Sequence, residues 1–239
     1  MTEQDQAAMG NQAGDRADEG QTAGTAKRSA VVYAAAALAV LLVGAAIGML
    51  ITLSAVGRDD PPGADSVDVG FAQDMRTHHL QAITMAGWAR NGSQDAEIRQ
   101  LAFDIESTQL DQSGQFSGWL TAWGQPALAP IDQPHMRWMA GAAHGHGDGP
   151  AGTEQMPGMA TSEELARLRN STGAEFDVYF LQLMLRHHEG GLEMAAYAAD
   201  HARLGYVRNM AAKIKQGQQA ESTLLTDMLT ARGSKPLPS

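Results

Sequence analysis

Two pairs of adjacent histidines, His78-His79 and His187-His188, are the residues of this sequence best suited to chemistry. Each pair has one methionine a helical turn before it and another about two turns after it. Imidazole nitrogen and thioether sulfur form a soft ligand set that favours copper, especially Cu(I), whereas zinc prefers thiolate, imidazole and carboxylate. We therefore predict a site for copper, as Cu(I) or Cu(II), with zinc as the alternative metal. The candidate ligands are His78, His79, His187, His188, Met75, Met85, Met184 and Met194.

A looser set of the same residue types lies in a glycine-rich stretch between the two pairs. His144 and His146 stand within it, and Met156 and Met159 follow. Flexible tracts of histidine and methionine suit metal capture better than core packing. These four residues are a candidate secondary metal site, and the alternative is that both histidines are solvated loop residues.

A purely structural role is the alternative for each candidate ligand taken singly, because methionine often fills gaps in a core. Two copies with the same neighbours are harder to explain by packing, so we favour the metal site. Glu189 and Glu193, which flank the second pair, are candidate acceptors for an imidazole N–H. Because protons compete with metal for imidazole nitrogen, we expect binding to weaken as pH falls through about 6.5.

Other chemistries find little support in the sequence. It has no cysteine, which excludes disulfides, iron–sulfur clusters and cysteine nucleophiles. No glutamate has a histidine three residues later, as a di-iron carboxylate bundle requires. The net charge of −10 argues against nucleic acid as a partner. Since the sequence offers no acid–base constellation either, a binding protein is favoured over an enzyme.

The histidine pairs belong to two copies of one longer pattern, displaced by 109 residues. Phe71 corresponds to Phe180, for example, and Ile105 to Ile214. A fixed displacement indicates an internal repeat. Apolar residues recur in each copy at steps of three and four, which indicates amphipathic helices, and no window alternates like a strand. The repeats, residues 65–123 and 174–233, each predict a helical hairpin, and two hairpins predict an all-α four-helix bundle.

The segment between the repeats, residues 124–173, is rich in proline and glycine. Thr161 and Glu164 have the spacing of a capping box and predict one short helix there. We expect the rest to be a long loop that lies outside the bundle.

The N-terminal part of the chain predicts a disordered tail, residues 1–29, followed by a membrane anchor, residues 30–57. Residues 30–56 carry no charge, and about 20 apolar residues suffice to cross a bilayer. A cleaved signal peptide is the main alternative. Arg16, Lys27 and Arg28 precede the span, which places the N-terminus inside and residues 58–239 outside the cell membrane.

The sequence also resembles a known family. The resemblance is carried by Phe71, Met75, His78-His79 and Ala82, then Gly158-Met159, Phe176-Asp177, Met184, His187-His188-Glu189-Gly190 and Met194-Ala195. Over residues 65–233 this pattern resembles the bacterial domain-of-unknown-function 305 family. The resemblance implies a ferritin-like four-helix bundle, exported or membrane-anchored, and some members are implicated in copper binding and copper tolerance. The sequence departs from the family pattern at Gly191, where a small alanine is usual.

Taken together, these features predict a membrane-anchored, extracytoplasmic protein that binds copper and buffers it or passes it on. The first alternative is a structural or partner-binding bundle without metal. The second is a metal-dependent redox enzyme. The sequence leaves the partner protein and the oligomeric state open.

Overall fold

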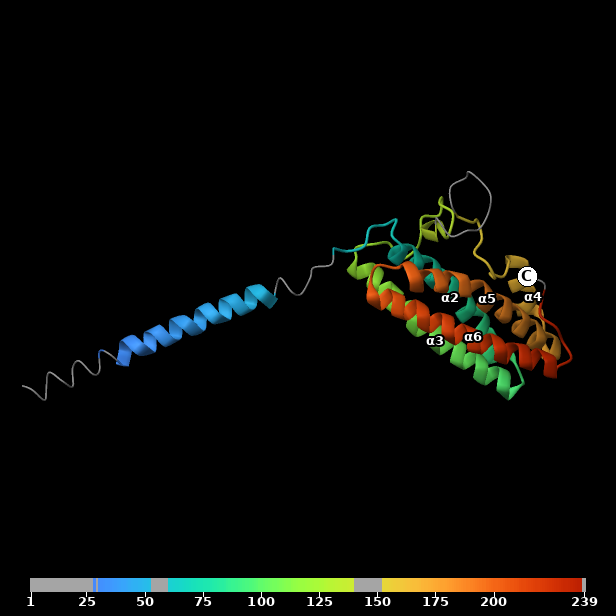
Figure 1. Cartoon of the computed structure of the whole chain (residues 1–239). Helices are drawn as coiled ribbons and strands as arrows, with labels where there is room; N and C mark the ends of the chain where they lie inside the picture. Colours follow the sequence, from blue (N-terminus) through green and yellow to red (C-terminus); the bar gives the residue numbers. More distant parts are fainter. Residues whose placement is uncertain (1–27, 29, 53–59, 140–151, 238–239) are drawn as a thin grey trace, which may run out of the picture. The chain divides into compact units, whose positions relative to one another are not determined.

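The computed structural model describes residues 28, 30–52, 60–139 and 152–237, in two compact units that divide after Asp60. The first unit contains an apolar helix, Ala30–Thr52, whose most apolar window has a mean hydropathy of 2.6 (Figure 1). By length and composition this helix could cross a membrane. The predicted disordered tail, apart from residue 28, lies outside the described residues.

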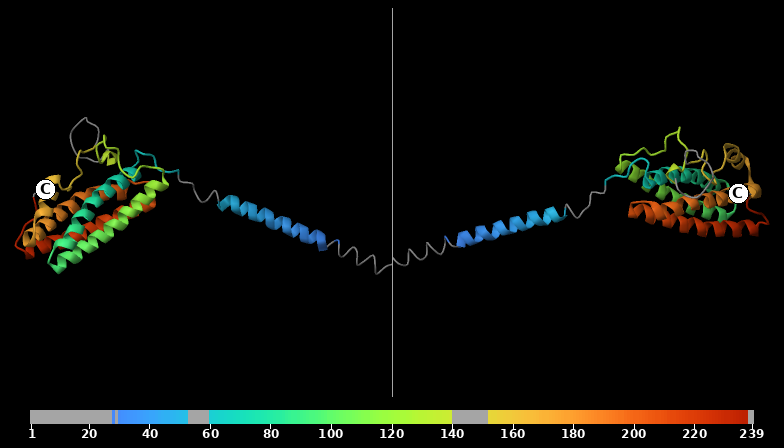
Figure 2. Two further views of the ribbon diagram at one scale, coloured as in Figure 1. Left: turned by 180° about the vertical axis from the view of Figure 1, so that it is seen from behind. Right: turned by 45° about the horizontal axis from the view of Figure 1, so that its top comes forward.

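The second unit is a four-helix bundle built from α2 (Val67–Gly92), α3 (Ala96–Ala122), α5 (Gly173–His201) and α6 (Gly205–Ala231). α2 packs along α3 and α5 packs along α6, and the two hairpins meet through α2 and α5 (Figure 1 and Figure 2). No strand occurs in the part of the chain that the structure describes. This confirms the predicted all-α fold.

Side-chain caps fix where the helices begin. Ser66 accepts a hydrogen bond from Val69 N at the start of α2, and Asp95 accepts from the first amides of α3. α4 (Ser162–Asn170) begins with the predicted capping box. α6 has no cap of its own; the buried carboxylate of Asp68 in α2 accepts from Arg203 N and Leu204 N instead. Asp68 thereby ties the start of one hairpin to the turn of the other.

The apolar core is divided into two clusters at opposite ends of the bundle. The turn-end cluster joins the second half of α2 to the first halves of α3 and α5 and to the end of α6. The loop-end cluster joins the complementary halves of the same four helices. The large buried members of the turn-end cluster include Met85, Ile98, Ile105, Leu168, Phe176, Tyr179, Phe180, Leu181, Leu183, Met184, Leu225 and Leu229. Those of the loop-end cluster include Phe71, Met75, Phe116, Leu120, Trp138, Met139, Met156, Met194 and Ile214.

Part of the segment between the repeats packs into this core, so the expectation that it lies outside the bundle is wrong. Trp138, in the short 3-10 helix η1 (Arg137–Met139), is 8% exposed and packs in the loop-end cluster. It lies directly on Gly70 of α2, where an added Cβ would come within 2.3 Å of the indole ring. Met139 and Met156 are buried beside it.

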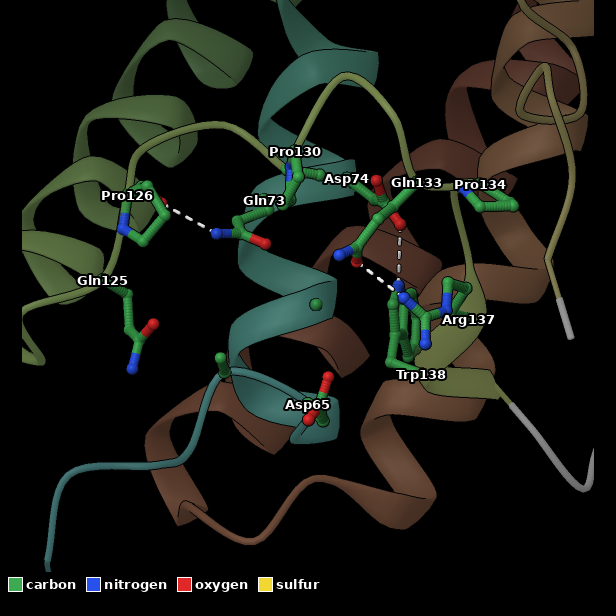
Figure 3. A pocket seen from close by; sticks show the side chains of 13 residues that line it. Asp65, Gln73, Asp74, Gln125, Pro126, Pro130, Gln133, Pro134, Arg137 and Trp138 are labelled. Atoms are coloured by element: carbon green, nitrogen blue, oxygen red, sulfur yellow. Dashed lines mark hydrogen bonds between the residues drawn. The ribbon is translucent and has the colours of Figure 1, made fainter. Parts of the chain in front are cut away.

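A buried carboxylate holds this segment in place. Asp74 of α2 accepts hydrogen bonds from His135 Nδ1 at 2.7 Å, Met136 N at 2.7 Å and Trp138 Nε1 at 2.8 Å. Figure 3 shows the bond from Trp138. A carboxylate that is 3% exposed needs such partners, because an unpaired buried charge is costly. No periodic pattern in the sequence indicates these contacts, because they come from a loop.

Further along, the segment crosses α5 in direct backbone contact. We call residues 157–158 the strap. An added Cβ on Gly190 would lie 2.2 Å from Pro157 O, and one on Gly158 would lie 2.4 Å from Arg186 O. Gly158 also has a φ of +78°, which favours glycine. Glycine on both sides therefore allows the strap to lie against α5 next to the second histidine pair.

Candidate metal centre

The four paired histidines lie fully buried between the two apolar clusters, in what we call the histidine layer. The two histidine helices meet there: the rings of His78 and His187 have centroids 3.8 Å apart, with 36° between their planes. The rings of His187 and His188 are 6.4 Å apart. The structure thus brings the two sequence repeats together at their most distinctive residues.

The hydrogen bonds of the inner pair define its protonation. His78 Nε2 lies 3.2 Å from Pro157 O in the strap, and His187 Nε2 lies 3.1 Å from the backbone oxygen of His78. A carbonyl oxygen only accepts, so in both rings Nε2 carries the proton and donates it. The Nδ1 atom of each neutral ring is then left with a free lone pair.

The outer pair is bonded to the second helix of each hairpin. His79 Nε2 lies 2.7 Å from Gln112 Oε1 of α3, and His188 Nε2 donates to Glu221 Oε2 of α6 at 2.6 Å. Both partners stand 33 residues after their histidine, so they occupy equivalent positions in the repeat. The carboxylate that accepts from His188 is therefore Glu221, rather than Glu189 or Glu193 as expected.

The Nδ1 atoms of all four histidines are buried and have no hydrogen-bond partner. Buried polar atoms are rarely left unpaired, and each exception requires an explanation. Histidines that ligate metal bind it through one nitrogen and donate the other N–H to a carboxylate or backbone carbonyl. The residues of the layer fit a metal ion by this criterion.

Burial keeps the imidazoles of His78, His79 and His187 neutral by lowering their pKa values. Loss of solvation lowers the pKa of His78 to about 4. The same cause, with the neighbouring His78, lowers the pKa of His79 to about 3. The pKa of His187 is also held well below its ordinary value, by burial first and then by the other histidines. The expected weakening of metal binding near pH 6.5 therefore moves to lower pH.

The four candidate methionines are all fully buried, in two pairs on opposite sides of the histidine layer. Met75 and Met194 lie in the loop-end cluster, and Met85 and Met184 lie in the turn-end cluster. Within the described ranges, no three His, Asp or Glu side chains are grouped so that they could hold an ion. The other candidate donors beside the imidazoles are thioether sulfurs, a set that favours copper over zinc.

The candidate secondary site is only partly visible. His144 and His146 lie outside the described residues. Met156 is buried in the loop-end cluster and Met159 packs partly buried against it. A surface pocket of about 510 Å³, lined by Gln73, Gln125 and Arg137 among others, contains none of the predicted ligands (Figure 3).

Further buried polar residues, on α3 and α6, lie outside the set of ligands predicted from the sequence. Gln109 and Gln218 are buried, and both amide atoms of each lack a hydrogen-bond partner. The hydroxyls of Ser113 and Ser222 are buried and unpartnered as well. Both pairs obey the same 109-residue displacement that relates His78 to His187. Repeated polar residues in the second helix of each hairpin were the signal that could have revealed them.

Comparison with known proteins identifies a family and a fold. The family model described as "Domain of unknown function (DUF305)" matches residues 68–229. No curated protein matches the sequence.

Several solved structures are similar to this chain. A DUF305 protein from Streptomyces coelicolor, described as secreted, is 37% identical with a TM-score of 0.66, over 74% of this chain and all (100%) of its own. A DUF305 fragment from Deinococcus radiodurans is 31% identical with a TM-score of 0.56, over 69% and 96% of the two chains. CopM in its Cu(I)-bound form shares the fold at 21% identity and a TM-score of 0.52, over 69% and 96% of the chains.

Proposed function

The chain belongs to the DUF305 family, and we propose that it is a membrane-anchored, extracytoplasmic copper-binding protein that buffers the ion. The observation that carries the proposal is the set of four buried Nδ1 atoms without partners. In the inner pair, each Nδ1 atom carries a free lone pair on a neutral ring. A hydrogen bond from Nε2 of the same ring fixes the orientation of that ring. Ligands held in this way are ordered before the ion arrives, which favours tight binding.

The chemistry of the layer favours Cu(I). Met75 and Met184, both fully buried, each stand one helical turn before a histidine pair, and thioether sulfur prefers soft cations. CopM, which shares the fold, has been solved in a Cu(I)-bound form. That likeness supports the proposal without identifying the ligands in this chain.

The proposed location rests on the apolar helix Ala30–Thr52 and on the charges around it. The helix is long enough to span, and the basic residues precede it, so the bundle would lie outside. The similar Streptomyces coelicolor protein is described as secreted, which agrees with an exported bundle. Retention of the full chain in the membrane pellet after alkaline carbonate washing tests the anchor; release of a shortened chain would indicate a cleaved signal peptide.

Copper binding is tested on the full chain in detergent by anaerobic competition for Cu(I) against a chromogenic chelator. The double variant His78→Phe/His187→Phe keeps two rings in the layer but removes both lone pairs. We expect it to bind Cu(I) at least about 100-fold more weakly, equivalent to about 2.7 kcal/mol.

His201→Phe is the matched control, because His201 is an exposed ring at the end of α5. It should bind Cu(I) like the original chain, and circular dichroism should show equal helix content in all three proteins. Equal affinity in the double variant would contradict the proposed site and favour a bundle that packs its histidines without metal.

A further inference from the structure

The histidine layer is closed to solvent in most directions. Along the bundle axis it is covered by the turn-end cluster on one side and the loop-end cluster on the other. Laterally, α2 packs along α3 and α5 packs along α6. On the side where α2 meets α5, the strap lies against Gly190 and bonds to His78. An ion could pass these sides only if packed elements separated.

The remaining side of the histidine layer, between α3 and α6, is less tightly packed than the others. These two helices approach each other less closely than the other neighbouring pairs. A cavity of about 20 Å³ lies between them, with Thr108 and Gly217 at its exposed rim. Its other lining residues are Gln109, Gln112, Ile214, Gln218 and Glu221. A cavity of this size, with amide and carboxylate groups in its lining, holds one water molecule or a small ion.

The cavity borders the histidine layer, because two of its lining residues bond to histidines. Gln112 and Glu221 line it and also hold His79 and His188 by hydrogen bonds. Gln218 lies next to His78, because an added Cβ on Gly191 would meet Gln218 Oε1 at 2.7 Å and His78 Cε1 at 3.2 Å. The residue that corresponds to Gly191 in the first repeat is Ala82. Because Gly191 lacks the methyl group of an alanine, Gln218 and His78 can both lie against it, and the first repeat has no equivalent space.

We propose that this cavity is a transit site through which a soft univalent cation, Cu(I) or Ag(I), enters and leaves the histidine layer. This inference rests on the proposed copper binding and adds the route by which the ion reaches the histidines. Gln109 and Gln218 are 3% and 4% exposed, and their amides have no partner in the fold. Their oxygens can replace water around a passing ion, and the Glu221 carboxylate offsets its charge.

The oxygens of the transit site are harder donors than imidazole or thioether. They should hold the ion weakly and pass it on, whereas the layer retains it. Substitutions in the transit site should therefore change rates of uptake and release together, and leave the equilibrium affinity almost unchanged.

Gly217→Phe is the decisive variant, because an added side chain meets nothing within 4 Å there and would extend over the cavity rim. Gly114→Phe is the matched control: it changes another exposed helical glycine with open space around it, away from the cavity. Uptake and release are measured on the full chain in detergent by stopped-flow exchange of Cu(I) with a chromogenic chelator.

We expect Gly217→Phe to slow both rates about tenfold or more, with Kd within about threefold of the original. Gly114→Phe should match the original chain. Gln218→Ala, which removes an amide that would replace water around the passing ion, should slow both rates as well and decides the matter if Gly217→Phe does not fold. The proposed path would be wrong if Gly217→Phe and Gln218→Ala both exchanged Cu(I) at the rates of the original chain. It would also be wrong if a variant changed Kd but left the rate of uptake unchanged. If the original chain binds no Cu(I), the proposed function itself fails.

Discussion

At the residue scale, the histidine layer links the fold to protons as well as to metal. An imidazole buried with a lowered pKa stays neutral in the folded chain, while the same ring in the unfolded chain has a pKa of about 6.5. Below that pH these histidines are protonated in the unfolded chain but stay neutral in the folded chain. Acid therefore favours unfolding, and each such histidine adds to the effect.

We expect the free energy of unfolding to be independent of these histidines above about pH 6.5 and to fall as pH drops below it. The loss should approach about 1.4 kcal/mol per pH unit for each of His78, His79 and His187, the buried histidines with a lowered pKa. For His78 it should continue down to its folded pKa of about 4. Urea unfolding of the metal-free chain at about pH 7, 6 and 5 measures the slope.

The His78→Phe/His187→Phe variant should show a shallower slope, because two of the titrating rings are gone. The same slope in both proteins would mean that other groups cause the acid sensitivity. Cu(I) affinity should likewise hold steady around pH 6.5 and weaken only as the pH approaches the lowered pKa values.

The candidate ligands could be predicted from sequence because they form adjacent pairs in a repeat. Their partners could not, because Gln112 and Glu221 stand 33 residues away on other helices. The lowered pKa values could not be predicted from the sequence either, because they depend on how deeply each ring is buried. Glu189 and Glu193 looked suitable only because they are close to His188 along the chain.

At the scale of elements, the segment between the repeats is held by one side chain of α2. Asp74→Asn keeps the shape of that side chain but removes its charge and one acceptor oxygen. Of the three donors bound to Asp74, at least one must then lose its acceptor. We expect the variant to lose about 1–3 kcal/mol of unfolding free energy, measured by urea denaturation.

Asp132→Asn is the matched control, since Asp132 is exposed in the same segment. A surface change of this kind should stay within about 0.5 kcal/mol of the original. If Asp74→Asn changed the free energy of unfolding as little as the control does, the packing of this segment would contribute little to the stability of the bundle.

The helices themselves could be predicted because their signals are local. The amphipathic period and the capping box of α4 need only neighbouring residues. The packing of Trp138 against Gly70 joins a loop to a helix through tertiary contacts, and composition suggested the opposite. The proline and glycine content of residues 124–173 correctly predicted irregular backbone, but it did not indicate which of these residues are buried.

At the scale of the whole molecule, the repeat was enough to predict a bundle of two hairpins. It could not predict how unequal the halves are. The strap bonds to His78 of the first repeat yet crosses α5 of the second, and Glu221 replaces the amide of Gln112. These differences come from single residues within a shared pattern.

The division of the core has a consequence for hydrogen exchange. Each helix of the bundle contributes one half to each apolar cluster, so the unit that opens is an end of the bundle rather than a hairpin. Backbone amides before and after His78 in α2 should then exchange with deuterium at different opening free energies. An ion bound in the layer would join the two ends, and Cu(I) loading should bring these energies together. Mass spectrometry of peptides from the two halves of α2 would detect the change; exchange that instead divides by hairpin would mean that the layer does not separate the core.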